Sequence, residues 1–428
     1  MMKSAVRIRT LVTLAGVMLA APGAFLTVGY LCFTPLAVSS GERDVLSLGL
    51  VSFMLMVMTL GAGSILLWHG LRSTRGRSSA LLRLPPAWLM VAIFGLFVTV
   101  GFFIHQNNLA AGFFFPPILF VAAAMPPLLA VAWFMRQRTE GFTWRRGSVA
   151  FVGGATVGVA IAMVMEILLP VVVLALVLGL GDVVSRNVQG LLDALAGKNI
   201  ALALTNPGFI YVFVQIAIIA PLAEEFAKPL VTLPLMGRLS RREAFLVAAM
   251  AGAGFAALEN VLYAGFGLYF WAGILLVRAL GGAIHPLGAG LVGLGWRDVL
   301  RGEPNAWRNG LAYFGLAAGV HAIWNGGSLI VITLAGAQFA AGGEFPPEIN
   351  VLGFSAAGTT LAVLIVLGLA ALWLGRSIVQ QAVQPGTPKV ESADVQFLIS
   401  DRAVAIWALA CLVAIVPAGI TGLRLLVR

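Results

Sequence analysis

The sequence contains few charged residues and only two cysteines. Only 10% of the 428 residues are Asp, Glu, Lys or Arg, whereas 60% are hydrophobic and 50 are glycine. Soluble domains carry about 25% charged residues, so this composition excludes a soluble domain and indicates a polytopic helical membrane protein. Cys32 and Cys411 lie in different apolar segments and show neither metal-ligand nor redox spacing. We therefore interpret both as small apolar packing residues.

Long apolar segments, by contrast, occur along the whole chain. A stretch of about 20 apolar residues is long enough to cross a bilayer as a helix. We expect an all-α fold with about eleven transmembrane helices, at residues 11–33, 45–69, 84–104, 111–135, 148–180, 206–236, 243–265, 268–296, 309–335, 352–375 and 403–424. The sixth segment carries Pro221, Pro229 and Pro234, so we expect it to be kinked.

The positive charge of the chain gathers between these segments. The net charge is +10, and most of the 27 basic residues fall on the cytoplasmic side if the N-terminus is cytoplasmic. This distribution follows the positive-inside rule and predicts an N-in, C-out topology. The basic excess is therefore a topology signal, and we expect a lipid bilayer and no nucleic acid as partner.

Three regions differ in the polar residues that they place inside the membrane. Residues 1–147 form an N-terminal four-span region with no ionisable group deep in the membrane. Residues 148–335 form a five-span region that holds nearly all the intramembrane polar groups. Residues 336–428 add two spans, separated by a polar cytoplasmic linker at 380–394. The middle region is therefore the candidate functional core.

Glu224 and Glu225 stand together in the sixth predicted span, with Lys228 one helical turn later. An ionised side chain near the bilayer centre costs about 2.5–3.5 kcal/mol even on the lenient insertion scale, which makes a functional site the default hypothesis. Because an α-helix turns about 100° per residue, Glu224 and Lys228 share a face and can form an ion pair. We expect Glu225 to be free of that pair and to be the better candidate base. A structural Glu–Lys lock explains the motif alone equally well.

The next three predicted spans each add polar side chains at similar estimated depth. These residues are Glu259 and Asn260, Arg278 and His285, and His321 and Asn325. Two histidines with one or two glutamates can hold Zn²⁺ through three protein ligands and leave a position open for water. Alternatively, a metal-free glutamate activates water while His and Asn donate to the developing oxyanion. Both arrangements predict a hydrolytic site, and the spacing leaves the choice between them open.

The order of these motifs resembles the PrsW family of intramembrane proteases, which is related to the CAAX prenyl endopeptidase and bacteriocin-processing membrane protease group. The matching pieces are EExxK at 224–228, FxxxEN at 255–260, Arg278 followed by His285, and HxxxN at 321–325. The resemblance covers roughly residues 206–335. It implies a membrane-embedded endopeptidase that cuts membrane-associated proteins, in a bacterial cytoplasmic membrane.

The resemblance also implies roles for individual residues. Glu225 or Glu224 would activate the attacking water. Glu259 and His285 would bind metal or stabilise the transition state together with His321. The site-supporting residues would be Lys228, Asn260, Arg278 and Asn325. The family has been described both as a metalloprotease and as glutamate-dependent, and its best-known role suggests a membrane-anchored anti-sigma factor, cut at site 1, as a substrate class.

Two other functions compete with proteolysis. A proton- or ion-coupled transporter also uses Glu and His inside the membrane, and Glu166 in the fifth predicted span favours this hypothesis most. Transporters usually contain inverted repeats with matching broken helices, and no second Glu-Glu element occurs in the other half of the chain. A non-catalytic scaffold would use the same groups only for interhelical hydrogen bonds. The sequence indicates no particular oligomeric state.

Overall fold

The predicted all-α class is confirmed in the part of the chain that the structure describes. The computed structural model describes residues 2–39, 45–105, 109–135, 142–166, 207–266, 268–340, 350–351 and 354–381. These ranges are helical apart from short connections and one small hairpin, in which β1 (Asn350–Val351) pairs antiparallel with β2 (Phe354–Ser355). The predicted span at 403–424 and nearly all of the predicted linker lie outside the described residues.

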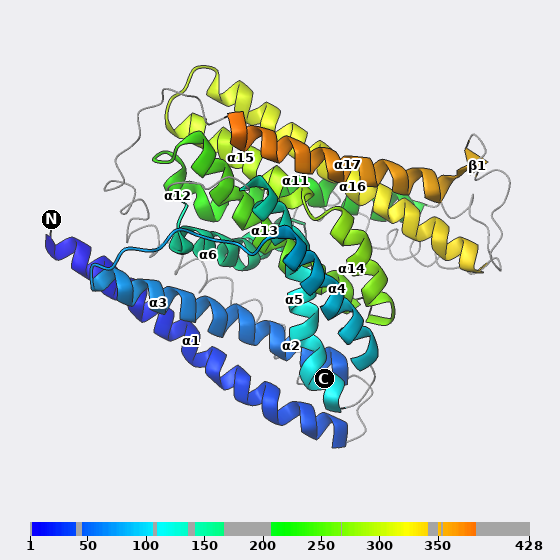
Figure 1. The fold of residues 1–428 in the computed structure, drawn as a ribbon, viewed down its shortest axis with the longest axis horizontal. Helices are drawn as coiled ribbons and strands as arrows, with labels where there is room; N and C mark the ends of the chain where they lie inside the picture. Colours follow the sequence, from blue (N-terminus) through cyan, green and yellow to red (C-terminus); the bar gives the residue numbers. More distant parts are fainter. Residues whose placement is uncertain are drawn as a thin grey trace, which may run out of the picture.

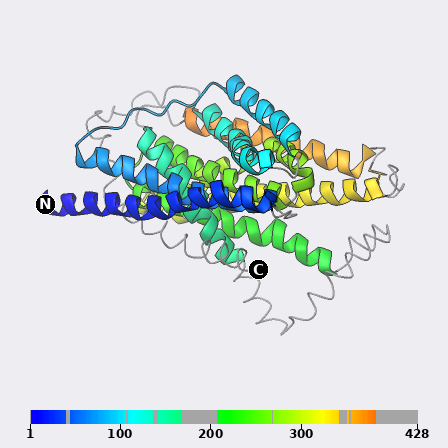
Figure 2. The same cartoon turned by 90° about the horizontal axis from the view of Figure 1, so that it is seen from below.

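The N-terminal region is built from long helices that pack in antiparallel pairs. They are α1 (Met2–Ser39), α2 (Val45–Met56), η1 (Val57–Gly61), α3 (Ala62–Thr74), α4 (Ala87–Ile104) and α5 (Leu109–Phe134). α1 lies beside the rod formed by α2, η1 and α3 (Figure 1 and Figure 2). Gly16, Gly23 and Gly63 form the contact, since a Cβ on any of them would approach backbone atoms of the facing helix closer than 3.0 Å. Small residues allow this close approach in membranes.

The middle region and the last described helix surround one buried helix. Their elements are α6 (Trp144–Gly153), η2 (Gly154–Gly158), α10 (Pro207–Val214), η3 (Gln215–Ile219), α11 (Ala220–Ala227), η4 (Leu230–Thr232), α12 (Leu233–Met236), α13 (Arg241–Phe266), η5 (Leu268–Phe270), α14 (Trp271–Leu280), α15 (Ile284–Leu300), α16 (Ala306–Ala340) and α17 (Ala356–Gln381). α13 is 94% buried over its apolar window, against 11% for α4 and 17% for α17. α13 is therefore the core helix, whereas α4 and α17 present most of their surface to lipid.

Close contacts of α13 with its neighbours position the polar residues of the middle region. A Cβ on Gly252 would overlap the carbonyl oxygen of His285, so α13 and α15 touch backbone to backbone at this level. A Cβ on Gly254 would likewise overlap the carbonyl oxygen of Phe151 in α6. Alanine and glycine in α13 thus allow α15 and α6 to approach closely, which brings Glu259 near the start of α15.

The described residues contain eight helices that are long and apolar enough to cross a membrane, or nine if the bent pair of α14 and α15 forms one span. The count of eleven and the N-in, C-out orientation therefore stay predictions. The segment predicted as one span at 268–296 is instead broken, with a 45° bend between α14 and α15. Gly281 and Gly282 lie at the break, and Pro286 lies in the first turn of α15, where a missing N–H leaves no hydrogen bond unmade.

Helix packing against α13 yields a first testable prediction. A Cβ on Gly154 in η2 would overlap the backbone of Ala251, so we expect Gly154→Ala to destabilise the protein by about 1–3 kcal/mol through overpacking. Gly319 in α16 is the matched control, because a Cβ there meets no atom within 4 Å. Thermal unfolding in detergent should therefore show a clear loss for Gly154→Ala and none for Gly319→Ala. Equal midpoints for both variants would contradict this packing.

Candidate active site

The glutamate pair lies on a short helix that ends inside the protein. Pro221 is in the first turn of α11, and the helix ends at Ala227 with Lys228 as its C-cap, directly before Pro229. The regular α-helix is interrupted at Lys228 and Pro229, at one of the prolines for which the sequence predicts a kink. Glu224 is 4% exposed and Glu225 is fully buried. The α11 helix therefore delivers two carboxylates into the interior of the middle region.

Lys228 binds both glutamates of α11. Its Nζ lies 2.7 Å from Glu225 Oε1 and 3.1 Å from Glu224 Oε2. The prediction that Glu225 is free of the ion pair is therefore wrong. Residues three and four positions apart are both neighbours on a helix, and the long lysine side chain reaches between the two carboxylates. The ammonium group also lies 4.7 Å from the centre of the Phe255 ring, which adds a cation–π contact.

His321 of α16 is held by the same pair of residues. Its Nδ1 lies 2.9 Å from Glu225 Oε1 and 3.4 Å from Lys228 Nζ, and the side chain is fully buried. A carboxylate only accepts hydrogen bonds, so the contact with Glu225 assigns the proton to Nδ1. The Nε2 atom of His321 therefore keeps its lone pair, and it lies on the side of the ring opposite to Glu225.

His285, at the start of α15, is held in the opposite way. Its Nε2 lies 3.1 Å from Glu259 Oε2, and Arg278 Nη2 lies 2.7 Å from the same oxygen. Arg278 Nη2 also lies 3.3 Å from His285 Nε2, so this nitrogen lies between a carboxylate and a guanidinium. The other ring nitrogen, Nδ1, has no hydrogen-bond partner within the described ranges and lies on the side of Glu224. Phe255 stacks against this imidazole at 6.0 Å between ring centres and an interplanar angle of 24°.

Arg278 and Asn260 connect this histidine to the α5 helix. Arg278 Nε donates to Asn260 Oδ1, and Asn260 Nδ2 donates to the carbonyl oxygen of Ala123 at 3.0 Å. Arg278 is thus fixed by a neutral acceptor on one side and by Glu259 on the other. The chain of contacts from α5 to Glu259 holds the His285 ring in one orientation.

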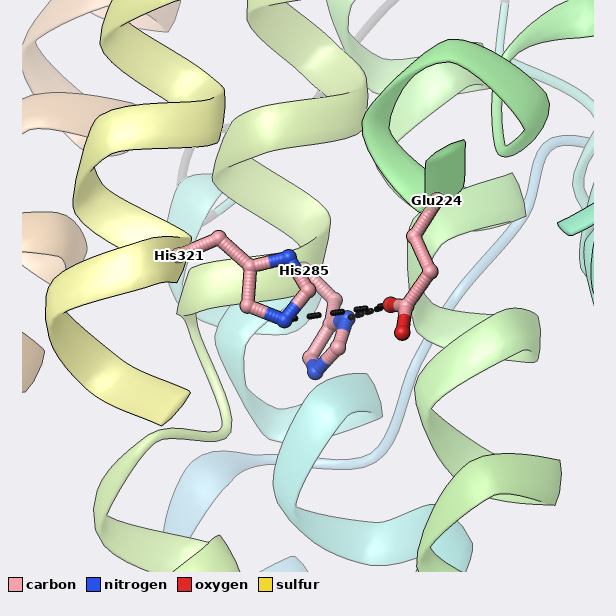
Figure 3. Close-up of side chains that lie close together, drawn as sticks. All are labelled: Glu224, His285 and His321. Carbon is pink, nitrogen blue, oxygen red and sulfur yellow. Dashed lines mark ion pairs between the residues drawn. The ribbon is translucent and has the colours of Figure 1, made fainter. Parts of the chain in front are cut away.

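Three buried side-chain atoms converge at the centre of the cluster (Figure 3). Glu224 Oε2 lies 3.8 Å from His285 Nδ1 and 3.8 Å from His321 Nε2, and the three atoms lie within 4.8 Å of one another. The two rings meet edge to face at 4.6 Å between their centres. Neither nitrogen has a hydrogen-bond partner within the described ranges. A buried lone pair without a donor is costly, so this arrangement fits a cation better than an empty space.

The donor set agrees with a divalent metal site. One carboxylate and two imidazoles are ligands of catalytic zinc, which keeps a further position open. The other nitrogen of each imidazole lies next to a carboxylate, at 2.9 Å from Glu225 for His321 and 3.1 Å from Glu259 for His285, which is the arrangement of metal-bound histidines in most sites. Across the cluster, three carboxylates face two cations, Lys228 and Arg278, so a formal negative charge remains for a metal to balance.

The structure places the predicted ligands differently from the predicted set of Glu259, His285 and His321. Glu259 lies behind His285, on the Nε2 side of its ring, and Glu224 takes the place facing both histidines. Asn325 Nδ2 donates to the carbonyl oxygen of Ile216, 3.1 Å away in η3, so this amide fixes α16 against a π-helical turn. The other predicted site residues meet in one cluster, as expected from their depth.

Sequence reasoning gave no role in the site to two aromatic residues, Phe255, which it noted only as part of the FxxxEN motif, and Tyr263. Phe255 packs under both Lys228 and His285, and Tyr263 lies 4.5 Å below the Arg278 guanidinium. Both are four residues away from Glu259 on α13 and therefore lie on the same helical face. That spacing is the signal that could have found them.

Comparison with known proteins identifies the family of this cluster. Residues 143–355, about half of the chain, match the family described as PrsW family intramembrane metalloprotease. The matched segment includes every residue of the cluster and extends the resemblance seen in the motifs at both ends. No curated protein and no solved structure matches the chain. The chain thus belongs to the PrsW family of intramembrane proteases, and it is a membrane-embedded hydrolase.

Proposed function

We propose that this protease hydrolyses membrane-associated proteins at the cluster of Glu224, His285 and His321. The observation that carries the proposal is the convergence of three buried lone-pair atoms within 4.8 Å of one another, two of them on imidazoles oriented by carboxylates. A scaffold needs hydrogen-bonded polar groups, whereas these two imidazole nitrogens have no hydrogen-bond partner within the described ranges. The arrangement therefore favours catalysis over a purely structural role.

Glu224 Oε2, His285 Nδ1 and His321 Nε2 would hold the metal, and Zn²⁺ suits this donor set. A bound zinc ion acts as a Lewis acid that polarises a carbonyl group and acidifies water. With the metal bound, Glu225 and Glu259 would each accept the N–H of the imidazole nitrogen that faces away from the ligand position. Lys228 limits the repulsion between the adjacent carboxylates of α11.

The same geometry also accommodates the metal-free mechanism. Glu224 Oε2 is the carboxylate oxygen that faces both imidazoles, so it would take the proton of the attacking water. The histidines would then stabilise the developing oxyanion. Glu225, which is fully buried and held by Lys228 and His321, acts as a positioning residue in both mechanisms.

The substrate that we propose is a membrane-anchored regulator such as an anti-sigma factor, as the family relationship suggests. The test compares the membrane proteomes of cells that carry the wild type, His321→Ala or His69→Gln. We expect a single-span protein to accumulate at full length with His321→Ala and to appear as a fragment in the other two strains. His69 is the control, since it hydrogen-bonds Ser148 at 3.0 Å, away from the cluster. Identical processing in all three strains would contradict the proposal.

The role of Glu225 can be separated from that of a catalytic base. We expect Glu225→Gln to weaken metal binding about 10–100-fold, because the carboxamide orients His321 less firmly than the carboxylate does. Hydrolysis by the variant should then recover when the metal concentration is raised to saturation. Metal titration with an activity readout measures both quantities. Activity as low as that of His321→Ala at saturating metal would instead make Glu225 the base.

A further inference from the structure

The helix Trp144–Glu166 runs parallel to α13 in a fixed register. This register places Glu166 relative to the active site. Arg146 pairs with Glu243 at 2.8 Å, and the two residues are 97 positions apart. The same offset joins Gly158 to Phe255, since a Cβ on Gly158 would lie 3.4 Å from the Phe255 ring. The pair formed by Gly154 and Ala251, described above, also has this offset. At the end of the helix Trp144–Glu166, the same offset of 97 positions places Glu166 beside Tyr263.

The side of the helix that carries Glu166 points towards the catalytic cluster. Val159 and Ala162 pack with Ala227, Phe255 and Leu258, which flank the catalytic glutamates in the sequence. Glu166 follows Ala162 by four residues and Val159 by seven, so the three share one helical stripe. The neighbouring positions, Met163 and Val164, are about half exposed and lie on the lipid side. Glu166 therefore lies on the stripe that faces the site.

The backbone of Glu166 is fixed, whereas its carboxyl group is available. Gln215 Nε2 donates to the Glu166 carbonyl oxygen at 3.1 Å, and this hydrogen bond connects the end of the helix Trp144–Glu166 to η3. Within the described part of the chain, the Glu166 carboxyl group has no hydrogen-bonded or ion-paired side chain. It is partly exposed, whereas Glu224, Glu225 and Glu259 are all buried and held by cations. Glu166 is thus the accessible carboxylate near the cluster.

Tyr263 is the second accessible side chain near the cluster. It follows Glu259 by one helical turn on α13, and its ring packs against the Arg278 guanidinium at 4.5 Å. Like Glu166, it is partly exposed. Electrostatic interactions connect both residues with Glu224 and Glu259, which agrees with their position beside the cluster. Arg278 holds the ring, and the hydroxyl group is left as a donor and acceptor for another molecule.

We propose that Glu166 and Tyr263 form a subsite that binds the backbone of an unwound substrate segment. This inference rests on the proposed function. Tyr263 lies four residues after Glu259, which contacts His285 of the active site, and the rise of about 6 Å along α13 between them equals about two residues of an extended peptide. A transmembrane substrate must lose helical hydrogen bonds to expose a peptide bond, and its freed N–H and C=O groups need partners in a medium without water. The Glu166 carboxylate accepts an N–H about two residues from the scissile bond, and the Tyr263 hydroxyl donates to a C=O.

The experiment measures kinetics with full-length protein in proteoliposomes. The probe is the single-span protein that stays uncut in membranes with His321→Ala. We expect Glu166→Ala to raise KM about tenfold or more while kcat changes less than about twofold, because a hydrogen bond to a charged group is lost outside the reacting centre. Glu166→Gln should recover part of the loss, since its amide oxygen still accepts a hydrogen bond. Tyr263→Phe should also raise KM, and Met163→Leu on the lipid side should match the wild type.

Proline substitutions in the probe identify the substrate group that Glu166 binds. Proline lacks an N–H group that could donate to Glu166. At one position about two residues from the cleaved bond, a proline in the probe should therefore raise the KM of the wild type. The same proline should leave the already raised KM of Glu166→Ala unchanged. An equal cost of proline in both enzymes at every position, or an unchanged KM for Glu166→Ala, would overturn the subsite and leave the protease function intact. Failure of the proposed function itself would look different, because wild-type and His321→Ala membranes would then process every protein alike.

Discussion

Removal of divalent metal from the purified protein should lower peptide hydrolysis by at least about 10³-fold, and Zn²⁺ added back should restore it. The expected size follows from the several kcal/mol by which a Lewis acid stabilises the developing charge in the transition state. Glu224, His285 and His321 supply the three donor atoms within 4.8 Å of one another. The measurement is hydrolysis of the identified substrate in proteoliposomes before chelation, after chelation and after Zn²⁺ is added back.

Ligand variants provide the control for this result. His285→Ala and His321→Ala should stay inactive whether or not Zn²⁺ is added, because each lacks one of the three donors. His69→Gln, outside the cluster, should lose and regain activity as the wild type does. Undiminished hydrolysis by chelated wild type, with no metal detected in the sample, would contradict the metal site. Glu224 would then be the base of a metal-free mechanism.

Replacement of Lys228 by methionine should cause the largest loss of stability. The ammonium group is fully buried and lies 2.7 Å from Glu225 and 3.1 Å from Glu224. Its removal leaves buried carboxylates without their cation, and breaking a buried pair in this way costs about 3–5 kcal/mol. The free energy of unfolding of the metal-free protein in mixed micelles measures the effect. Metal-free protein is required because a bound cation would compensate Glu224.

The double variant Glu225→Gln/Lys228→Met tests the cause of that loss. With the charge of Glu225 also removed, the double variant should be clearly more stable than Lys228→Met alone. The double-mutant cycle should therefore give a large coupling energy between the two residues. Additive effects of the two substitutions would mean that Lys228 acts through packing against Phe255 and not through its charge.

The convergence of Glu224, His285 and His321 could be predicted from the sequence, whereas the orientation of their side chains could not. Apolar segment lengths set the depth of Glu224, His285 and His321, and these residues do meet. Helix rotation and the break between α14 and α15 decide which nitrogen of His285 lies near Glu224 and which lies near Glu259. That break rests on tertiary contacts, since a Cβ on Gly281 would overlap the Trp324 ring. No local pattern in the sequence shows this contact.

The error about Glu225 has a related cause. Helical geometry correctly placed Glu224 and Lys228 on one face, but it did not show where the flexible lysine side chain ends. In the structure the Lys228 ammonium lies between both carboxylates. His321 approaches Glu225 from α16 and completes the cluster there. Contacts between spans that are distant in sequence decide such details. The interruption of the helix at Pro229, directly after α11, is by contrast a local effect and could be predicted.

The metal content of the purified protein tests the central claim most directly. We expect about one divalent metal ion per chain in the wild type and less than about a tenth of that in His285→Ala, with both proteins folded. The His285→Ala variant removes one of the three donor atoms and leaves Glu224 and His321 in place. Equal metal content in the two proteins, or an active wild type that contains none, would contradict a metal centre formed by Glu224, His285 and His321.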